Sequence, residues 1–253
     1  MSNTILYLTD NTLEPAIASA CRVVLKREAR EIPIVSVSQK PIELGLNICV
    51  GEIGRNWISL YKQILAGLEV IETGFVVIAE HDCMYSHEHL SWTPPKDDRF
   101  YYNHNHWLVQ WGGNHPEMNG MYSYWPNRTA LSQMIAAKDL IFESTSEVLS
   151  LLEMGLQVKR GMRWHGEFGA ANENKDFMKA AEAAESGYPI QLQRYLKNYV
   201  TKYVAEPFRT CVSNLDIRHG TNFTGPKRGK NRTFILPYWG SFENIMRHPE
   251  RRV

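Results

Sequence analysis

The sequence has few cysteines, no long apolar run and no strong net charge, and each of these absences excludes a class of protein. Four scattered cysteines among 253 residues argue against a disulfide framework or a zinc knuckle and favour a reducing compartment. No stretch is apolar for long enough to span a bilayer, and the N-terminus lacks the pattern of a signal peptide. A net charge of +1 gives no overall attraction to DNA or to an anionic membrane. We therefore expect a cytoplasmic globular protein.

The N-terminal third alternates short apolar runs with amphipathic stretches. Strands are predicted over residues 4–8 and 34–38, with a helix over 14–30 between them. A second helix is predicted over 57–70, and the apolar run at 75–79 fits a strand that is buried on both faces. Because strand–helix–strand units form parallel sheets, we expect a single α/β domain over the whole chain. Its central sheet should be mostly parallel and flanked by helices.

The rest of the chain is less regular. Residues 83–127 are rich in aromatic side chains, His, Asn and Pro. Helical spacing returns over residues 129–154, 175–185 and 188–204. From residue 216 onward, the Gly, Pro and Lys/Arg pattern is typical of a mobile loop.

Glu80, His81 and Asp82 directly follow the buried strand at 75–79. Open parallel sheets bind ligands outside the carboxyl ends of their strands. Side chains alternate along a strand, so Glu80 and Asp82 should point the same way and His81 the other way. Two convergent carboxylates repel each other, and a hard divalent cation such as Mg²⁺ or Mn²⁺ removes that repulsion. The alternative is that the three residues merely end the strand with a polar turn.

The VVIAEHD segment at 76–82, which follows a strand–helix–strand unit and a helix start at Gly54-Arg55-Asn56, resembles the nucleotide-binding half of GT-A-fold glycosyltransferases. The resemblance covers roughly residues 4–90. It implies a Rossmann-like fold, a UDP-sugar donor and a cation that bridges the donor's diphosphate, with Asp82 as a metal ligand. Glu80 stands where the family's motif usually begins with Asp, so Glu80 is expected to act as a helper. The family also implies a third ligand from the C-terminal loop, and His219 is in the right place for it.

The resemblance further implies a division of the domain. Residues 1–90 would bind the nucleotide-sugar, 91–215 the acceptor, and 216–253 would form a closing loop and tail. The nucleotide base needs a pocket at the end of the first strand, for which Thr9, Asp10 and Asn11 are candidates. Arg55 is expected to face the diphosphate, or else to cap a helix.

Two further roles concern the leaving group and the acceptor. Arg218 and Lys227 lie in the segment that could close over the diphosphate and neutralise its charge, although exposed loop charges are the alternative interpretation. An inverting transfer also needs a carboxylate to deprotonate the acceptor hydroxyl. Glu167, flanked by glycines, fits best, with Glu117 and Glu173 as competitors.

Most of the nine histidines lie between His81 and His115, and two pairs have His-x-His spacing. On a strand, that spacing presents two imidazoles on one face, which is a known metal-site geometry. A His-rich metal-dependent hydrolase or oxygenase is therefore the second hypothesis. The surrounding aromatic rings equally suit stacking on a sugar or a base.

The segment DIRHGTNFTG at 216–225, together with the His- and aromatic-rich middle, also resembles phage-encoded glycosyltransferases that decorate hydroxymethylated pyrimidines in DNA. The implied acceptor is 5-hydroxymethylcytosine in DNA, in the cytoplasm of an infected host. Such an enzyme would extrude the base into a pocket and hold the phosphates with basic residues. The third hypothesis is a non-enzymatic nucleic-acid-binding module.

Overall fold

The structure, a computed structural model, describes residues 2–112, 116–124, 127–154, 167–169, 202–220, 232–233 and 235–251. Its elements within the first 91 residues are β1 (Asn3–Thr9), α1 (Pro15–Ala29), β2 (Ile34–Ser38), β3 (Leu46–Cys49), α2 (Trp57–Val70), β4 (Phe75–Glu80), β5 (Cys83–Met84) and α3 (His87–Ser91). The later elements are β6 (Phe100–Asn103), β7 (His106–Gln110), η1 (Pro116–Met118), β8 (Met121–Tyr124), η2 (Leu131–Gln133), β9 (Met134–Ala137), α4 (Lys138–Glu153), β10 (Ala205–Phe208), β11 (Asn214–Arg218), β12 (Arg232–Thr233) and α7 (Phe242–Arg247).

The central sheet has seven strands in the order β10-β6-β9-β4-β1-β2-β3. β1 pairs in parallel with both β2 and β4, and β2 pairs in parallel with β3. β9 runs antiparallel to its neighbours β4 and β6, while β10 is parallel to β6. The fold is therefore α/β with a mostly parallel central sheet flanked by helices, as the sequence predicts. The carboxyl ends of β1, β2 and β4 meet at one edge of the sheet.

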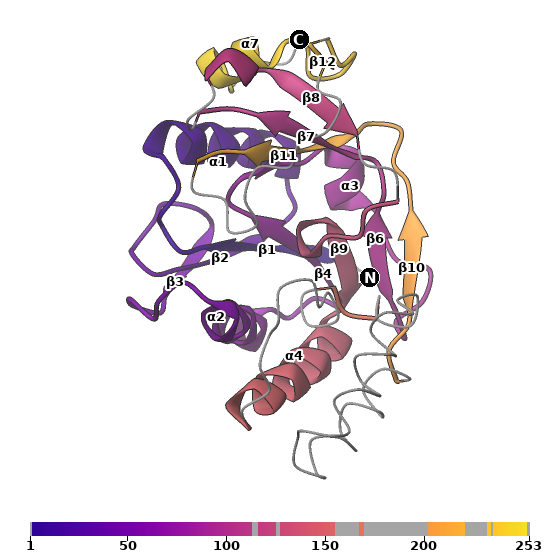
Figure 1. The fold of residues 1–253 in the computed structure, drawn as a ribbon. Helices are drawn as coiled ribbons and strands as arrows, with labels where there is room; N and C mark the ends of the chain where they lie inside the picture. Colours follow the sequence, from indigo (N-terminus) through magenta and orange to yellow (C-terminus); the bar gives the residue numbers. More distant parts are fainter. Residues whose placement is uncertain are drawn as a thin grey trace, which may run out of the picture.

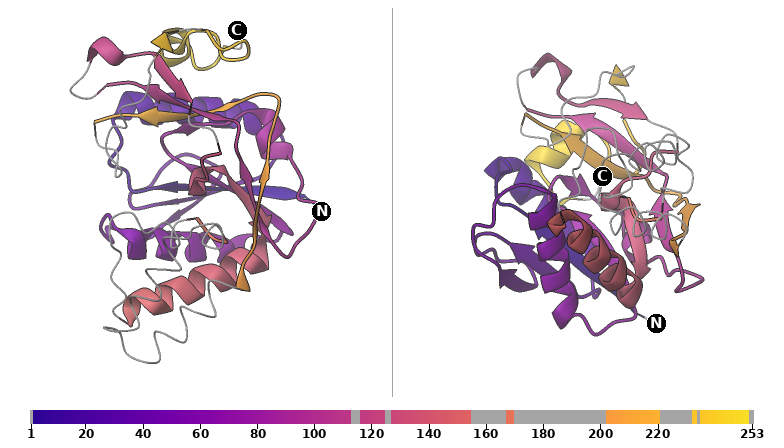
Figure 2. Two further views of the ribbon diagram at one scale, coloured as in Figure 1. Left: turned by 45° about the vertical axis from the view of Figure 1, so that its right-hand side comes forward. Right: turned by 60° about the horizontal axis from the view of Figure 1, so that its bottom comes forward.

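Helices cover both faces of this sheet (Figures 1 and 2). On one face, Leu6, Val37 and Ile78 pack with residues of α2 and α4. On the other face, α1 and α3 pack against alternate residues of the same strands. α1 also packs against the second sheet through residues such as Ile17 and Val24. This helix is therefore apolar on two sides, and it joins the two sheets. No helix in the described ranges combines the length and the hydropathy that crossing a bilayer requires.

The second sheet has five strands in the order β12-β8-β7-β11-β5. β11 pairs in parallel with β7 and antiparallel with β5, the short strand that follows the Glu80-His81-Asp82 turn. The backbone N–H of Ile217 donates a hydrogen bond to the carbonyl of Asp82 at 2.8 Å. Residues near position 217 are thereby fixed beside the end of β4. The prediction of a mobile loop from residue 216 onward is wrong for this part of the chain.

The predicted helix at 129–154 is also wrong in its first part. The structure has η2 and β9 there, and α4 begins only at Lys138. The sequence Met-Ile-Ala-Ala of β9 is compatible with a helix, but its four residues are buried between β4 and β6, where they form ladder hydrogen bonds. The helices predicted at 175–185 and 188–204 lie outside the described residues, apart from 202–204.

Candidate active site

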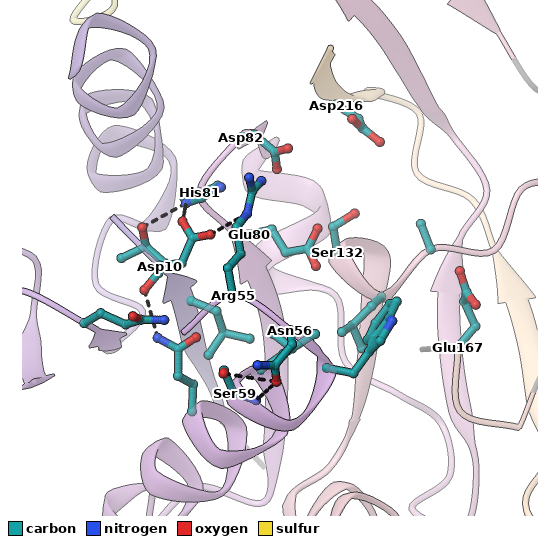
Figure 3. A pocket seen from close by; sticks show the side chains of 18 of the residues that line it. Asp10, Arg55, Asn56, Ser59, Glu80, His81, Asp82, Ser132, Glu167 and Asp216 are labelled. Atoms are coloured by element: carbon teal, nitrogen blue, oxygen red, sulfur yellow. Dashed lines mark hydrogen bonds and ion pairs between the residues drawn. The ribbon is translucent and has the colours of Figure 1, made fainter. Parts of the chain in front are cut away.

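A cavity of about 220 Å³ opens at the carboxyl ends of β1, β2 and β4. Its floor contains the strand-end residues Leu8, Thr9 and Glu80, and one wall comes from the first turn of α2. The opposite wall comes from β11 and from residues 128–132 and 167. Figure 3 shows Asp10 and His81 on one side of this cavity, Glu167 on the other, and Glu80 between them. The cavity therefore lies where an open α/β sheet is expected to bind a ligand.

The acidic turn, formed by Glu80, His81 and Asp82, differs from its prediction in one respect. β4 ends at Glu80, and His81 and Asp82 form a turn. Strand alternation therefore no longer applies to His81, and all three residues line the cavity. The prediction that His81 points away is wrong. Its ring Nδ1 lies 2.8 Å from the hydroxyl of Thr9 and 3.6 Å from the carboxylate of Asp10, so His81 connects the ends of β4 and β1.

The structure brings Asp82 and His219 together. Nε2 of His219 lies 3.4 Å from Oδ2 of Asp82, and the His219 side chain is almost fully buried. Burial by itself raises the pKa of Asp82. The hydrogen bond from His219 and the charges of His81, His219 and Arg218 outweigh burial, so the pKa of Asp82 lies below its usual value. Asp82 is therefore an anion, as a metal ligand must be.

Glu80 and Cys83 complete a cluster of possible ligand atoms. The carboxylate oxygens of Glu80 and Asp82 and the sulfur of Cys83 all lie within 4.8 Å of one another. Burial raises the pKa of the Cys83 thiol, and a hard cation such as Mg²⁺ or Mn²⁺ prefers oxygen ligands to sulfur. Burial also raises the pKa of Glu80, and the nearby charges of Asp82 and Asp216 raise it further. A divalent cation relieves that repulsion, so the carboxylates of Glu80 and Asp82 suit a metal ion chemically, and the imidazole of His219 lies next to Asp82.

The residues predicted to bind the nucleotide fall into two groups. Thr9, Asp10 and Arg55 line the cavity, and Nε of Arg55 pairs with Oδ2 of Asp10 at 2.8 Å. Burial alone raises the pKa of Asp10, but hydrogen bonds from the backbone and hydroxyl of Thr12 and the charges of His81 and Arg55 lower it overall. Asn11 is different, because its side-chain oxygen accepts backbone hydrogen bonds from residues 39 and 40, each at 2.8 Å. Asn11 is not part of the cavity lining, and it holds the loops after β1 and β2 together.

Glu167 lines the cavity, and the next residue fixes its position. Phe168 is fully buried and packs against the rings of Tyr61 and Phe100, at centroid distances of 6.1 and 5.4 Å. The hydroxyl of Tyr102 donates to the carbonyl of Phe168 at 2.9 Å. Gly169 adopts a φ of +76°, and a Cβ there would lie 2.7 Å from the carbonyl carbon of Val204. A side chain at position 169 would therefore collide with the chain leading into β10.

Several cavity residues were not predicted, and Arg128 and Asp216 are the most important of them. Nη1 of Arg128 and Nη2 of Arg218 both contact Oδ2 of Asp216, at 2.8 and 2.9 Å. Asp216 and Arg218 are two residues apart on β11, and strand alternation would have placed them on one face if 214–218 had been recognised as a strand. No comparable local signal marks Arg128. The predicted Lys227 lies outside the described residues.

The described histidines do not support the hypothesis of a His-rich metal enzyme. His87 and His89 lie on helix α3, so their spacing does not present them on one strand face. His89 is buried, and its ring stacks on Tyr85 and Phe208. Within the described ranges, one group of three side chains could hold a metal ion, and it consists of Glu80, Asp82 and Cys83, with no histidine. His115 lies outside those ranges.

Comparisons with known proteins give weak matches. The sequence matches no protein-family model and no curated protein. Among solved structures, the chain is similar to the bifunctional IspDF of Campylobacter jejuni, with 10% identity and a TM-score of 0.32 over 57% of this chain and 43% of that one. It is also similar to a glycosyltransferase involved in glycosylation of the major capsid of PBCV-1, with 10% identity and a TM-score of 0.39 over 82% of each chain.

A third similar structure is a Drosophila β-1,4-galactosyltransferase in complex with manganese, UDP-Gal and xylobiose. The identity is 11% and the TM-score 0.33, over 64% of this chain and 66% of that one. The matches thus span less than half of IspDF and just under two thirds of the Drosophila enzyme.

Proposed function

We propose that the protein is a metal-dependent glycosyltransferase that moves a sugar from a UDP-sugar to an acceptor hydroxyl, with inversion at the anomeric carbon. One observation carries the proposal. Glu80 and Asp82 lie at the carboxyl end of β4, inside a cavity, and β11 brings His219 to 3.4 Å from Asp82. Carboxylate and imidazole groups at such a place suit a divalent cation that works with a bound diphosphate.

Asp82 and His219 would hold Mn²⁺ or Mg²⁺, with Glu80 beside them. When bound, the cation supplies Lewis-acid stabilisation to the diphosphate leaving group. Thr9, Asp10 and Arg55 lie on the side of the cavity nearest β1 and β2, so we assign them to the nucleoside end of the donor. For Arg55, this assignment replaces the predicted place at the diphosphate. Arg218, on the opposite wall, supplies a permanent positive charge toward the diphosphate.

Glu167 is the proposed general base. In the reaction, the acceptor oxygen forms a bond to the anomeric carbon of the sugar. The bond from that carbon to the diphosphate oxygen breaks, and UDP leaves with the electron pair. The carboxylate of Glu167 takes the proton of the acceptor hydroxyl. Glu167 lies on the opposite side of the cavity from Asp10, and Glu80 and Asp82 lie between them (Figure 3). This arrangement matches the order of nucleoside, diphosphate, sugar and acceptor that the transfer requires.

Thermal denaturation tests the proposal directly. UDP together with Mn²⁺ should raise the Tm of the wild-type protein, because a ligand that binds the folded state stabilises it. Asp82→Ala should abolish the part of this shift that depends on Mn²⁺. If no nucleoside diphosphate gives a metal-dependent shift, the proposal is wrong.

The acceptor is a separate question. DNA containing 5-hydroxymethylcytosine is the acceptor suggested by the resemblance of residues 216–225, and it stays a prediction. Incubating the protein with hydroxymethylated DNA and a panel of UDP-sugars, followed by mass spectrometry of the nucleosides, tests this acceptor. A mass increase of one hexose on the modified cytidine would support it. If the nucleoside stays unmodified while the same preparation hydrolyses the UDP-sugar or transfers its sugar to another acceptor, this DNA is excluded as the acceptor.

A further inference from the structure

Arg128 and Arg218 share one carboxylate oxygen in the cavity wall. Nη1 of Arg128 lies 2.8 Å and Nη2 of Arg218 lies 2.9 Å from Oδ2 of Asp216. All three side chains line the cavity, and their exposed fractions are 12%, 4% and 6%. Two guanidinium groups share this one carboxylate, and the neighbouring carboxylates of Glu80 and Asp82 are the groups assigned to the metal. Buried groups of like charge repel each other, so this arrangement favours a bound anion.

The position of Arg128 in the cavity indicates which part of a ligand it would meet. Arg128 forms an ion pair with Asp216, and the charge of Glu167, the proposed base, also acts on it. Both Arg128 and Arg218 also act electrostatically on Glu80. Arg128 therefore acts on both Glu80 and Glu167, whereas Asp10 forms its ion pair with Arg55. In the proposed complex with a nucleotide-sugar, the phosphate next to the sugar would lie between the metal ligands and the base, within reach of Arg128.

The hydrogen-bonding capacity of Arg128 supports the same assignment. A guanidinium has five N–H donors in a planar fork, which matches the oxygens of a phosphate. In the part of the chain that the structure describes, the hydrogen bonding of Arg128 is a single contact from Nη1 to Asp216. Burial by itself lowers the pKa of Arg128, but Asp216 raises it by more, so the group stays charged. Further donors on a fixed cation are thus available to a ligand in the cavity.

We propose that Arg128, oriented by Asp216 beside Arg218, binds the sugar-linked phosphate of a diphosphate ligand. The inference rests on the proposed function for the identity of the complete ligand, a nucleotide-sugar. The diphosphate itself can be tested without a nucleoside. Arg128 is then a binding residue for the leaving group, and its charge stabilises the negative charge that develops on the diphosphate during transfer.

Equilibrium binding of uridine, UDP and inorganic pyrophosphate, each with Mn²⁺, distinguishes the possibilities. Arg128→Gln should weaken binding of UDP and of pyrophosphate by roughly 10- to 100-fold, the usual effect of losing hydrogen bonds to a charged group. Uridine should bind both proteins equally. Arg128→Lys, which keeps the charge but not the fork, should recover part of the loss.

Arg209→Gln is the matched control. The guanidinium of Arg209 donates to the hydroxyl of Tyr124 and to the side-chain oxygen of Asn127, the residue before Arg128. Arg209 is not part of the cavity lining. This variant should bind all three ligands as the wild type does. Thermal melting of each variant without ligand verifies that it is folded.

Equal affinity of wild type and Arg128→Gln for pyrophosphate and UDP would overturn the inference. An equal loss for uridine and UDP would also overturn it, since that result indicates a structural role. The inference is equally wrong if the wild type binds neither pyrophosphate nor UDP. If Arg128→Gln weakens pyrophosphate binding while even the wild type fails to bind UDP, the diphosphate site stands and the proposed nucleotide-sugar function fails.

Discussion

The imidazole of His219 faces the carboxylate of Asp82, with Nε2 3.4 Å from Oδ2, although 137 residues separate them in the chain. The pairing of β11 with β5 and β7 produces this proximity, because it places the end of β11 beside the turn after β4. The hydrogen bond from Ile217 to the carbonyl of Asp82 fixes the register two residues before His219. A metal site that uses both side chains is therefore held by the second sheet.

His219→Ala should lower the affinity for Mn²⁺ by about tenfold or more, because the cation loses a directly placed ligand. The measurement is a calorimetric titration of Mn²⁺ in the presence of UDP. His248→Ala is the control, since the His248 side chain is about half exposed and faces Glu250 in the C-terminal segment, not Asp82. An unchanged Mn²⁺ affinity in His219→Ala would remove this residue from the metal site.

Glu167→Gln should lower kcat by roughly 10²–10⁴-fold, the usual contribution of a general base. Donor binding should change little, because Glu167 lies on the far side of the cavity from Asp10 and Arg55. Steady-state kinetics with a UDP-sugar and an accepted hydroxyl compound measure kcat and the KM of the donor separately. Glu153→Gln, at the exposed end of α4, is the matched control. A proportional rise in the donor KM with unchanged kcat would assign Glu167 to binding.

Much of the N-terminal half could be predicted from the sequence, because its elements depend on local patterns. The apolar run before Glu80 is long enough to identify a buried strand, and the polar residues that follow it mark the site. β9 could not be predicted in this way. Its sequence suits a helix, and it is a strand because β4 and β6 provide hydrogen-bonding partners on both sides.

The candidate site likewise contains residues that a local sequence pattern locates and residues that only the fold brings together. Asp82 could be placed at a ligand-binding edge from the strand that precedes it, and the resemblance to a family suggested His219. Arg128 and Asp216 could not be brought together from the sequence, because their contact joins β11 to the segment between β8 and η2. The hydrogen-bonding role of Asn11 was also missed, since it depends on the loop after β2 lying beside the loop after β1.

Gly169→Ala should destabilise the protein more than Gly120→Ala. Both glycines have nearly the same left-handed φ, +76° and +75°, so alanine costs about 1–2 kcal/mol of strain at either position. At position 169 the new Cβ would lie 2.7 Å from backbone of Val204, whereas the described chain leaves open space at position 120. This overlap should add roughly 1–3 kcal/mol to the loss of unfolding free energy.

Chemical denaturation of the two glycine variants measures the difference. Gly169→Ala should also reduce kcat, because the adjoining segment carries Glu167, while Gly120→Ala should leave kcat near the wild-type value. Equal loss of stability in both variants would show that the chain after Phe168 can move to accept a side chain, and that Glu167 is held less firmly than its packing indicates.

The protein should lose stability as the pH falls from about 6.5 to about 4, because of two buried histidines. Burial lowers the pKa of His89 to about 3, with the charge of His106 adding to the effect, and burial together with Arg128 lowers the pKa of His106 to about 4. An unfolded chain, with histidine pKa values near 6.5, therefore binds more protons than the folded chain in this window. Each histidine should remove about 2 kcal/mol of unfolding free energy between pH 6.5 and 5. Glu80, whose pKa is raised, acts in the opposite direction, and comparing variants cancels its contribution.

Urea denaturation at pH 7.5, 6 and 5 measures this effect. The free energy of unfolding should depend less steeply on pH in His89→Gln than in the wild type, and as steeply as in the wild type in His248→Gln. If the free energy of unfolding of His89→Gln depends on pH as steeply as that of the wild type, His89 does not remain neutral inside the fold.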